Sequence, residues 1–172
     1  MAARIVVDPA GELWWAGRNY RCALGRGGVR LDKREGDGAT PVGLFPLRRV
    51  LYRPDRLSAP VTRLPVAPLS PEDGWCDDPA DPLYNRPVRL PYAGCRDEGM
   101  WRSDGLYDVV VVIGHNDDPV IAGKGSAIFL HVAAPDYRPT QGCIALALPD
   151  LLAVLADSGL DVSLEIAGGA SG

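Results

Sequence analysis

The segment Tyr107–Gly114 (Y-D-V-V-V-V-I-G) places the strongest limit on how this chain folds. Its valines and isoleucine are β-branched residues, which favour strands, and the final glycine ends the run. A strand with apolar residues at successive positions has to be covered on both of its faces. We therefore expect a sheet in which this segment is a buried strand.

Shorter runs elsewhere predict more strands. Residues 4–16 are expected to form a hairpin around the turn Asp8–Gly11. Residues 149–156 are expected to form a short helix, with Pro149 in its first turn and Gly159 beyond its end. The remaining strands are predicted at residues 18–24, 47–52, 126–132, 143–148 and 161–166.

These elements predict a mainly β, sandwich-like domain with one short C-terminal helix. The domain is expected to span residues 1–168, and residues 169–172 to form a frayed tail. Residues 53–105 are rich in proline and acidic residues, so they predict long irregular loops. We expect these loops to be ordered and packed over the sheet, because they carry the large aromatic residues Trp75, Tyr84, Tyr92 and Trp101.

Composition excludes several functional classes. With 172 residues, of which 47% are hydrophobic, the chain suffices for one well-buried domain. It has no apolar run of the ~20 residues that span a bilayer. A net charge of −4 argues against nucleic-acid binding. The first residues lack the apolar stretch of a signal peptide, so the sequence predicts a cytoplasmic location.

The four cysteines show no spacing that is typical of a metal site. We therefore expect no structural zinc ion. Cys76 and Cys95 would be able to pair in an oxidising compartment, but the sequence does not show whether they lie close together. Cys143 is the cysteine with a motif-like setting.

Cys143 and His131 each lie at the edge of a strand-like segment, with a short loop between them. One interpretation is a catalytic pair, because a nearby imidazole activates a thiol as a nucleophile. The other is a buried structural cysteine beside a histidine whose hydrogen bonds are satisfied. Residue types alone favour the second interpretation.

Two motifs favour the catalytic interpretation. Thr140-Gln-Gly-Cys143, preceded by His131, resembles the active-site motif of the L,D-transpeptidases, the YkuD-type catalytic domains. Upstream, the segment Gly38–Phe45 (G-A-T-P-V-G-L-F) is similar to the Thr-Pro-x-Gly-x-Phe segment of that family. The resemblance covers about residues 20–155 and implies a YkuD-type fold.

The resemblance also implies roles for individual residues. Cys143 is expected to be the nucleophile that attacks a peptidoglycan stem peptide, and His131 the general base and acid. The backbone N–H groups of Gly142 and Cys143 are expected to stabilise the oxyanion. D-Alanine would leave, an amine of a second stem peptide would accept the acyl group, and no metal or organic cofactor would be required. The family's substrate implies a periplasmic or cell-wall location.

The chain departs from the family pattern at two positions. Gln141 replaces the histidine before Gly-Cys, and its amide can donate to an oxyanion or hold a loop but cannot titrate. Ala145 stands where the family often has an arginine. A substrate carboxylate would then need another cation, for which Arg138 is the first candidate and Lys124 the second. Attack by water would make the chain a carboxypeptidase-type hydrolase, and loss of turnover would leave a wall-binding or regulatory domain.

Three other residues complete the expected substrate site. Ser126 and Thr140 are expected either to orient His131 through their hydroxyls or to make local turn bonds. His115 precedes Asn-Asp-Asp-Pro, a sequence that is typical of a turn and less so of a metal site. His115 is alternatively expected to line the cleft near His131, if their two strands are neighbours.

Overall fold

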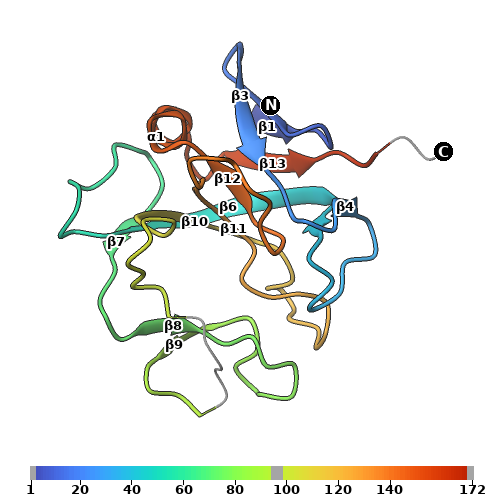
Figure 1. Cartoon of the computed structure of the whole chain (residues 1–172), viewed down its shortest axis with the longest axis vertical. Helices are drawn as coiled ribbons and strands as arrows, with labels where there is room; N and C mark the ends of the chain where they lie inside the picture. Colours follow the sequence, from blue (N-terminus) through green and yellow to red (C-terminus); the bar gives the residue numbers. More distant parts are fainter. Residues whose placement is uncertain (1–2, 94–98, 170–172) are drawn as a thin grey trace.

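The computed structural model describes residues 3–93 and 99–169 of the chain. Within them it is mainly β, with one helix, α1 (Leu148–Ala156), as predicted (Figure 1). The strands of the main sheet are β1 (Ala3–Val7), β2 (Glu12–Trp15), β3 (Arg18–Ala23), β6 (Gly43–Tyr52), β7 (Val66–Pro68), β10 (Val109–Ile113), β11 (Phe129–Val132), β12 (Ile144–Leu146) and β13 (Val162–Ile166). Two small ladders are formed by β4 (Val29–Arg30) with β5 (Thr40–Pro41), and by β8 (Asp73–Trp75) with β9 (Pro87–Arg89).

The main sheet closes on itself. Its strands follow the order β10-β11-β12-β3-β2-β1-β13-β6, and an antiparallel pairing of β6 with β10 completes an eight-stranded mixed barrel among the described residues. The long strand β6 makes this closure possible, because its first residues pair with β13 and its last residues with β10. The two layers of the expected sandwich are thus opposite sides of one closed sheet.

Strand β10 is apolar throughout because both of its faces are covered. Val109, Val111 and Ile113 face the barrel interior, together with the buried face of α1. Val110 and Val112 face a second apolar cluster on the outside of the barrel, which contains Trp75, Met100, Phe129 and Cys143. The buried strand predicted from the valine run is confirmed, and the second cluster is the one that contains the cysteine of interest.

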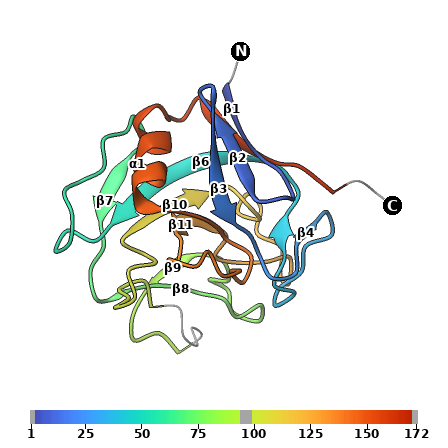
Figure 2. The same ribbon diagram turned by 45° about the horizontal axis from the view of Figure 1, so that its top comes forward.

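The second cluster is covered by the proline-rich segment that connects β6 to β10. Figures 1 and 2 show α1 and the β8–β9 hairpin on opposite sides, with the strands of the barrel between them. Trp75 packs edge-on against Phe129, with ring centroids 5.0 Å apart, and the Arg53 guanidinium lies 3.7 Å from the ring centroid of Trp101. The expectation of ordered loops over the sheet is confirmed for the described part of this segment.

Two points from the sequence concern disulfide pairing and membrane crossing. Cys95, whose pairing with Cys76 the sequence left open, lies outside the described residues. In the described ranges, no helix has the length and apolar character needed to cross a bilayer.

Candidate active site

Strands β11 and β12 bring His131 and Cys143 to the same face of the sheet. The two strands run parallel, and their register places His131 beside Ala145. Cys143 precedes Ala145 by two residues and so projects from the same face, because side chains alternate along a strand. Neighbouring strands lie about 4.8 Å apart and rise about 3.3 Å per residue. An imidazole and a thiol at this offset project into the same space.

The thiol of Cys143 is held by the segment that leads into β11. Its Sγ accepts a hydrogen bond from the Phe129 N–H at 3.3 Å and lies 3.2 Å from the Ala127 carbonyl oxygen, to which it donates. The residue is 8% exposed. The sulfur is therefore fixed in position at the floor of a cavity, with both of these contacts made by backbone groups.

The surroundings of His131 define its tautomer. Its Nδ1 lies 2.9 Å from the Val132 carbonyl oxygen. A carbonyl only accepts, so Nδ1 carries the proton and Nε2 keeps a free lone pair in the neutral ring. Burial lowers the pKa of His131 to about 4, the bond to Val132 opposes this shift, and the charges of Arg102 and Asp104 lower and raise the pKa respectively.

His131 is thus a neutral imidazole at pH 7, with Nε2 ready to accept a proton. The Tyr107 ring packs against it, with centroids 5.3 Å apart. Tyr107 and the neighbouring strands remove His131 from water, which is why its ring stays neutral.

The turn before Cys143 is organised by Thr140. Its hydroxyl donates to the Cys143 carbonyl oxygen at 2.7 Å and accepts from the Gly142 N–H at 3.0 Å. Gly142 has φ +138°, and a Cβ there would lie 2.8 Å from the Ala39 carbonyl oxygen. Glycine is required at this position both by the backbone conformation and by the close approach of Ala39. The Gly142 N–H is engaged within the turn, so it does not point freely to an oxyanion as expected.

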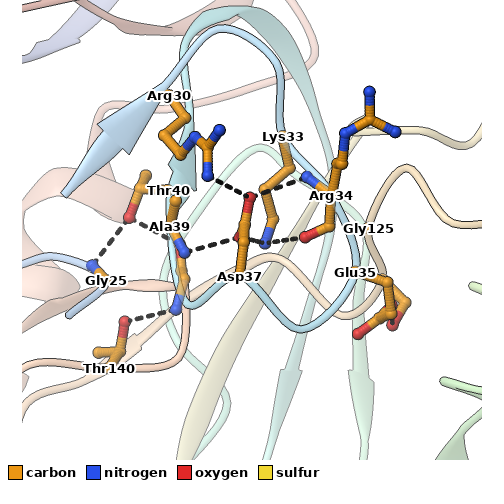
Figure 3. A network of polar contacts seen from close by, with 12 residues as sticks. Gly25, Arg30, Lys33, Arg34, Glu35, Asp37, Ala39, Thr40, Gly125 and Thr140 are labelled. Carbon is orange, nitrogen blue, oxygen red and sulfur yellow. Dashed lines mark hydrogen bonds and ion pairs between the residues drawn. The ribbon is translucent and has the colours of Figure 1, made fainter. Parts of the chain in front are cut away.

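The upstream Thr-Pro motif lies directly against this turn. The Thr40 hydroxyl donates to the Gly142 carbonyl oxygen at 2.8 Å and accepts from the Gly25 N–H at 2.9 Å. Figure 3 shows Thr40 beside Gly25 and near the Lys33–Asp37 ion pair. Asp37 also accepts from the backbone N–H groups of Arg34 and Ala39, which folds the β4–β5 loop into a fixed shape.

A cavity of about 300 Å³ opens between these elements. Cys143 and His131 both line it. The other polar residues in its wall come from the connections β3–β4, β4–β5, β8–β9 and β11–β12 and from the segments before β10 and β11: Arg26, Lys33, Glu35, Asp77, Arg102, Tyr107, Ser126, Arg138, Thr140 and Gln141.

A profile of the YkuD L,D-transpeptidase catalytic domain matches residues 2–160 of the chain. The chain belongs to the YkuD family. The resemblance read from the two motifs is confirmed, and the closed mainly β sheet with one short helix is consistent with the YkuD fold. No curated protein and no solved structure gave a significant match to the chain.

Several residues expected in the substrate site of this YkuD domain lie in the cavity. Arg138 and Gln141 line it and are exposed, with the Arg138 side chain 61% exposed and 3.8 Å from Asp136. Lys124 instead pairs with Asp32 at 3.7 Å and does not contribute to the lining. Of the two expected cations, Arg138 is the one placed to meet a ligand.

The two hydroxyls expected to orient His131 make other bonds. Ser126 lines the cavity but donates to Glu35 at 2.6 Å, and the Thr140 hydroxyl is used inside its own turn. The expectation that these hydroxyls orient His131 is therefore wrong. Their alternative, local turn bonding, is correct for Thr140.

His115 lies away from His131. Strands β10 and β11 are neighbours as supposed, but His131 pairs with Val110, five residues before His115. At about 3.3 Å per residue, this separates the two along the strand by roughly 16 Å. His115 lines a second cavity of about 260 Å³. In the described ranges, no three His, Cys, Asp or Glu side chains come together in a way that would hold a metal ion.

Sequence reasoning missed the contributions of Tyr107, Arg102 and Glu35 to the cavity. Tyr107 was read as part of a buried strand, yet its ring is the packing partner of His131. Arg102 lies with its guanidinium 5.0 Å from the Tyr107 ring centroid and forms an ion pair with Asp104. The Thr-Pro motif was the one sequence signal from a distant segment of the site, because its Thr40 bonds to the turn before Cys143.

Proposed function

We propose that this chain is a cysteine acyltransferase that acts on peptidoglycan stem peptides through a thioester on Cys143. Membership of the YkuD family supports L,D-transpeptidase-type activity. The observation that carries the assignment of residues is the position of Cys143 and His131 on one face of adjacent strands, in the wall of a single cavity.

In the first half of the reaction, the Cys143 sulfur attacks the carbonyl carbon that precedes the terminal D-alanine of a donor tetrapeptide. The thiol proton passes to Nε2 of His131 as the carbon–sulfur bond forms. Because His131 is neutral at rest with a pKa of about 4, this transfer accompanies the attack rather than preceding it. The carbon–nitrogen bond then breaks, and the imidazolium returns the proton to the departing amine of D-alanine.

In the second half, an amine of an acceptor stem peptide attacks the thioester carbonyl. The acceptor amine loses a proton to Nε2 of His131, and the carbon–sulfur bond breaks. The proton then passes to the sulfur, which regenerates the thiol and completes the cross-link. Water in place of the amine would give a free carboxylic acid, which is the hydrolase outcome.

The oxyanion that forms in both halves needs hydrogen-bond donors. Since the Gly142 N–H bonds to Thr140, we assign this role to the Cys143 N–H and to the side-chain amide of Gln141. Gln141 is exposed in the cavity wall. This replaces the pair of backbone donors expected from the sequence with one backbone group and one amide.

Arg138 is our candidate for the cation that binds a substrate carboxylate. It lines the cavity from the β11–β12 loop, next to the turn that carries the nucleophile. Its only ion pair, with Asp136 at 3.8 Å among the described residues, is exposed on both sides, and such pairs contribute little free energy. Arg138 is therefore able to exchange Asp136 for a ligand at little cost.

Product analysis tests this proposal. The protein is incubated with a purified stem tetrapeptide, with and without an amine acceptor, and products are followed by mass spectrometry. We expect a thioester adduct on Cys143, release of D-alanine and a cross-linked product that requires the acceptor. Free acid as the sole product in both mixtures would establish the hydrolase instead.

Matched cysteine variants assign the chemistry to one sulfur. Cys143→Ala should abolish both adduct and product, whereas Cys22→Ala should retain them. Cys22 is a suitable control because burial, with the charges of Asp8 and Glu12, raises its pKa to about 12. Full activity in Cys143→Ala would overturn the assignment, and an intact but inert wild-type protein would support a binding domain. We also propose a location on the wall side of the membrane, where peptidoglycan is cross-linked, which cell fractionation would test.

A further inference from the structure

The second cavity lies on the outer face of the barrel, between β6 and β10 on one side and the β8–β9 hairpin on the other. Two consecutive residues of β6, Arg48 and Arg49, both line it. Consecutive strand residues normally project to opposite faces. Here Arg49 pairs with Val112 while Leu47 pairs with Ile113, so Arg48 is the extra residue of a β-bulge.

The bulge therefore turns both arginines toward the same cavity. Bulges are enriched beside functional sites because they re-aim side chains in this way. Without the bulge, Arg48 would project to the barrel interior, among apolar residues such as Val50 and Ile113. A backbone irregularity thus concentrates positive charge at one place on the outer face.

This positive charge exceeds the negative charge that faces it. Asp117 accepts two hydrogen bonds from Arg48, at 3.0 and 3.1 Å, which satisfies that arginine. Arg86 also lines the cavity, and its guanidinium bonds to the Asp117 backbone carbonyl at 2.9 Å. Arg49 is a half-buried residue, and its guanidinium has no hydrogen bond or ion pair among the described residues.

A guanidinium in a cavity wall that lacks an anionic partner is available to bind an anionic ligand. His115, in the same wall, carries no charge at pH 7, because burial, with a further effect of Lys33, lowers its pKa to about 4. Its Nδ1 is also buried without a hydrogen-bond partner in the described part of the chain. Three arginines (Arg48, Arg49 and Arg86) face one aspartate (Asp117), so the cavity has an excess of about two positive charges. The Arg49 guanidinium and the His115 Nδ1 also remain able to form hydrogen bonds with a ligand.

The rest of the wall is apolar. Trp75, Phe129, Pro87 and Val112 supply aromatic and aliphatic surface. The Trp75 indole is held in place by its N–H, which donates to Asn85 at 3.0 Å. Concave sites that bind small organic molecules have this character, with an apolar wall and a few convergent polar groups. A bare inorganic ion would leave the aromatic wall unused.

We propose that the second cavity binds a small organic carboxylate, with Arg49 and Arg86 contacting the carboxylate and the Trp75 and Phe129 rings contacting its apolar part. A guanidinium matches a carboxylate with two parallel hydrogen bonds. Ile128 lies in the walls of both cavities. The new site is thus separated from the nucleophile's cavity by the segment that contacts the Cys143 sulfur.

The Trp75 indole N–H offers a direct reporter of binding. Its signal in a ¹H–¹⁵N spectrum is assigned by its disappearance in Trp75→Phe. The wild-type protein is then titrated with N-acetyl-D-alanine and, as a neutral match, with N-acetyl-D-alaninamide. We expect a saturable shift of the Trp75 signal with the acid and none with the amide. Equal responses to the two compounds would overturn the proposal without recourse to any variant.

Arginine variants locate the site. Arg49→Gln should weaken binding of N-acetyl-D-alanine at least tenfold, and Arg49→Lys should fall between Arg49→Gln and wild type. Arg18→Gln, which removes an exposed arginine elsewhere, should bind as wild type does. Loss of the response in Arg138→Gln but not in Arg49→Gln would place the ligand in the Cys143 cavity and overturn the proposal. Tighter binding of inorganic phosphate than of N-acetyl-D-alanine would contradict the proposal that the ligand is an organic carboxylate.

Discussion

The hydroxyl of Thr40 donates a 2.8 Å hydrogen bond to the carbonyl oxygen of Gly142, 102 residues further along the chain. The same hydroxyl accepts from the Gly25 N–H. Three distant segments are therefore joined at one buried oxygen, and one of them is the turn that precedes the nucleophile. The position of Cys143 depends on a residue that has no contact with the reacting atoms.

Removal of the Thr40 hydroxyl should impair both stability and activity. Thr40→Val leaves a buried N–H and a buried carbonyl without partners, at about 1–3 kcal/mol each. We expect the free energy of unfolding to fall by about 2–4 kcal/mol and kcat to fall about tenfold or more under conditions where the variant is folded. Urea denaturation and steady-state kinetics measure the two effects, and Thr40→Ser should restore most of both.

Thr62→Val is the matched control for this effect. The Thr62 hydroxyl also donates to a backbone carbonyl, that of Ser158, and accepts from a backbone N–H, that of Leu64. Its loss should lower stability and leave kcat unchanged. An equal effect of the two variants on kcat would show that Thr40 acts on the fold alone.

Alanine at Gly142 should disable the site. A Cβ at this residue would lie 2.8 Å from the Ala39 carbonyl oxygen, in addition to the cost of φ +138°. We expect Gly142→Ala to lose activity at least 100-fold and to lose on the order of 2 kcal/mol or more of stability. Gly123→Ala separates the two causes, because Gly123 has φ +83° but nothing within 4 Å of its added Cβ. Gly123→Ala should retain full activity.

The pH dependence of catalysis should reflect the buried state of His131. The acid limb of kcat/KM reports the general base of the free enzyme. Because the pKa of His131 is lowered to about 4, activity should persist well below pH 6 and fall with a midpoint near 4. A midpoint near 6.5 would contradict a neutral, buried base. His131→Gln should lower kcat by about 10²–10⁴, the usual contribution of a general base.

The pH dependence of stability should follow from the same burial. The chain has two histidines, and the pKa of each is lowered to about 4 in the folded protein. Unfolding lets both rings bind protons below their ordinary pKa of about 6.5. Their stabilising contribution is therefore complete above pH 6.5 and is lost as the pH falls toward 4, by on the order of 2–3 kcal/mol each.

Urea denaturation at several pH values between 7 and 4 measures this loss. The decrease should become smaller in His115→Gln and smaller again when His131 is also replaced. Carboxylates with lowered pKa values, such as Asp37 and Asp104, lose their contribution only at lower pH, below their ordinary pKa. If the free energy of unfolding falls with pH equally in wild type and in both histidine variants, the histidines do not cause the loss of stability.

Much of the fold was predictable because the sequence patterns that determine its strands and its helix lie within short segments. The valine run of β10 and the proline at the start of α1 act through neighbouring residues, and both elements lie where expected. Closure of the barrel was not predictable in this way. It depends on pairing between β6 and β10, about 60 residues apart, and on two neighbours for β6 at once.

The site was predictable in its residue types and less so in its bonds. Cys143 and His131 were identified from a motif, but residue type does not determine the hydrogen-bond partner of a hydroxyl. Ser126 therefore bonds to Glu35, which no local pattern indicated. Likewise, the charge state of His131 follows from its burial beside Tyr107, and burial is a property of the assembled fold.

The place of β13 in the barrel affects how the chain folds. This strand, near the end of the sequence, lies between the first strand, β1, and β6. The barrel therefore cannot close on a ribosome until residues 162–166 have emerged, and until then β1 and β6 each lack a neighbour. Such non-local pairing slows folding and leaves strand edges exposed during synthesis. A chain with this topology acquires the contacts that support Cys143 only after the whole barrel has been translated.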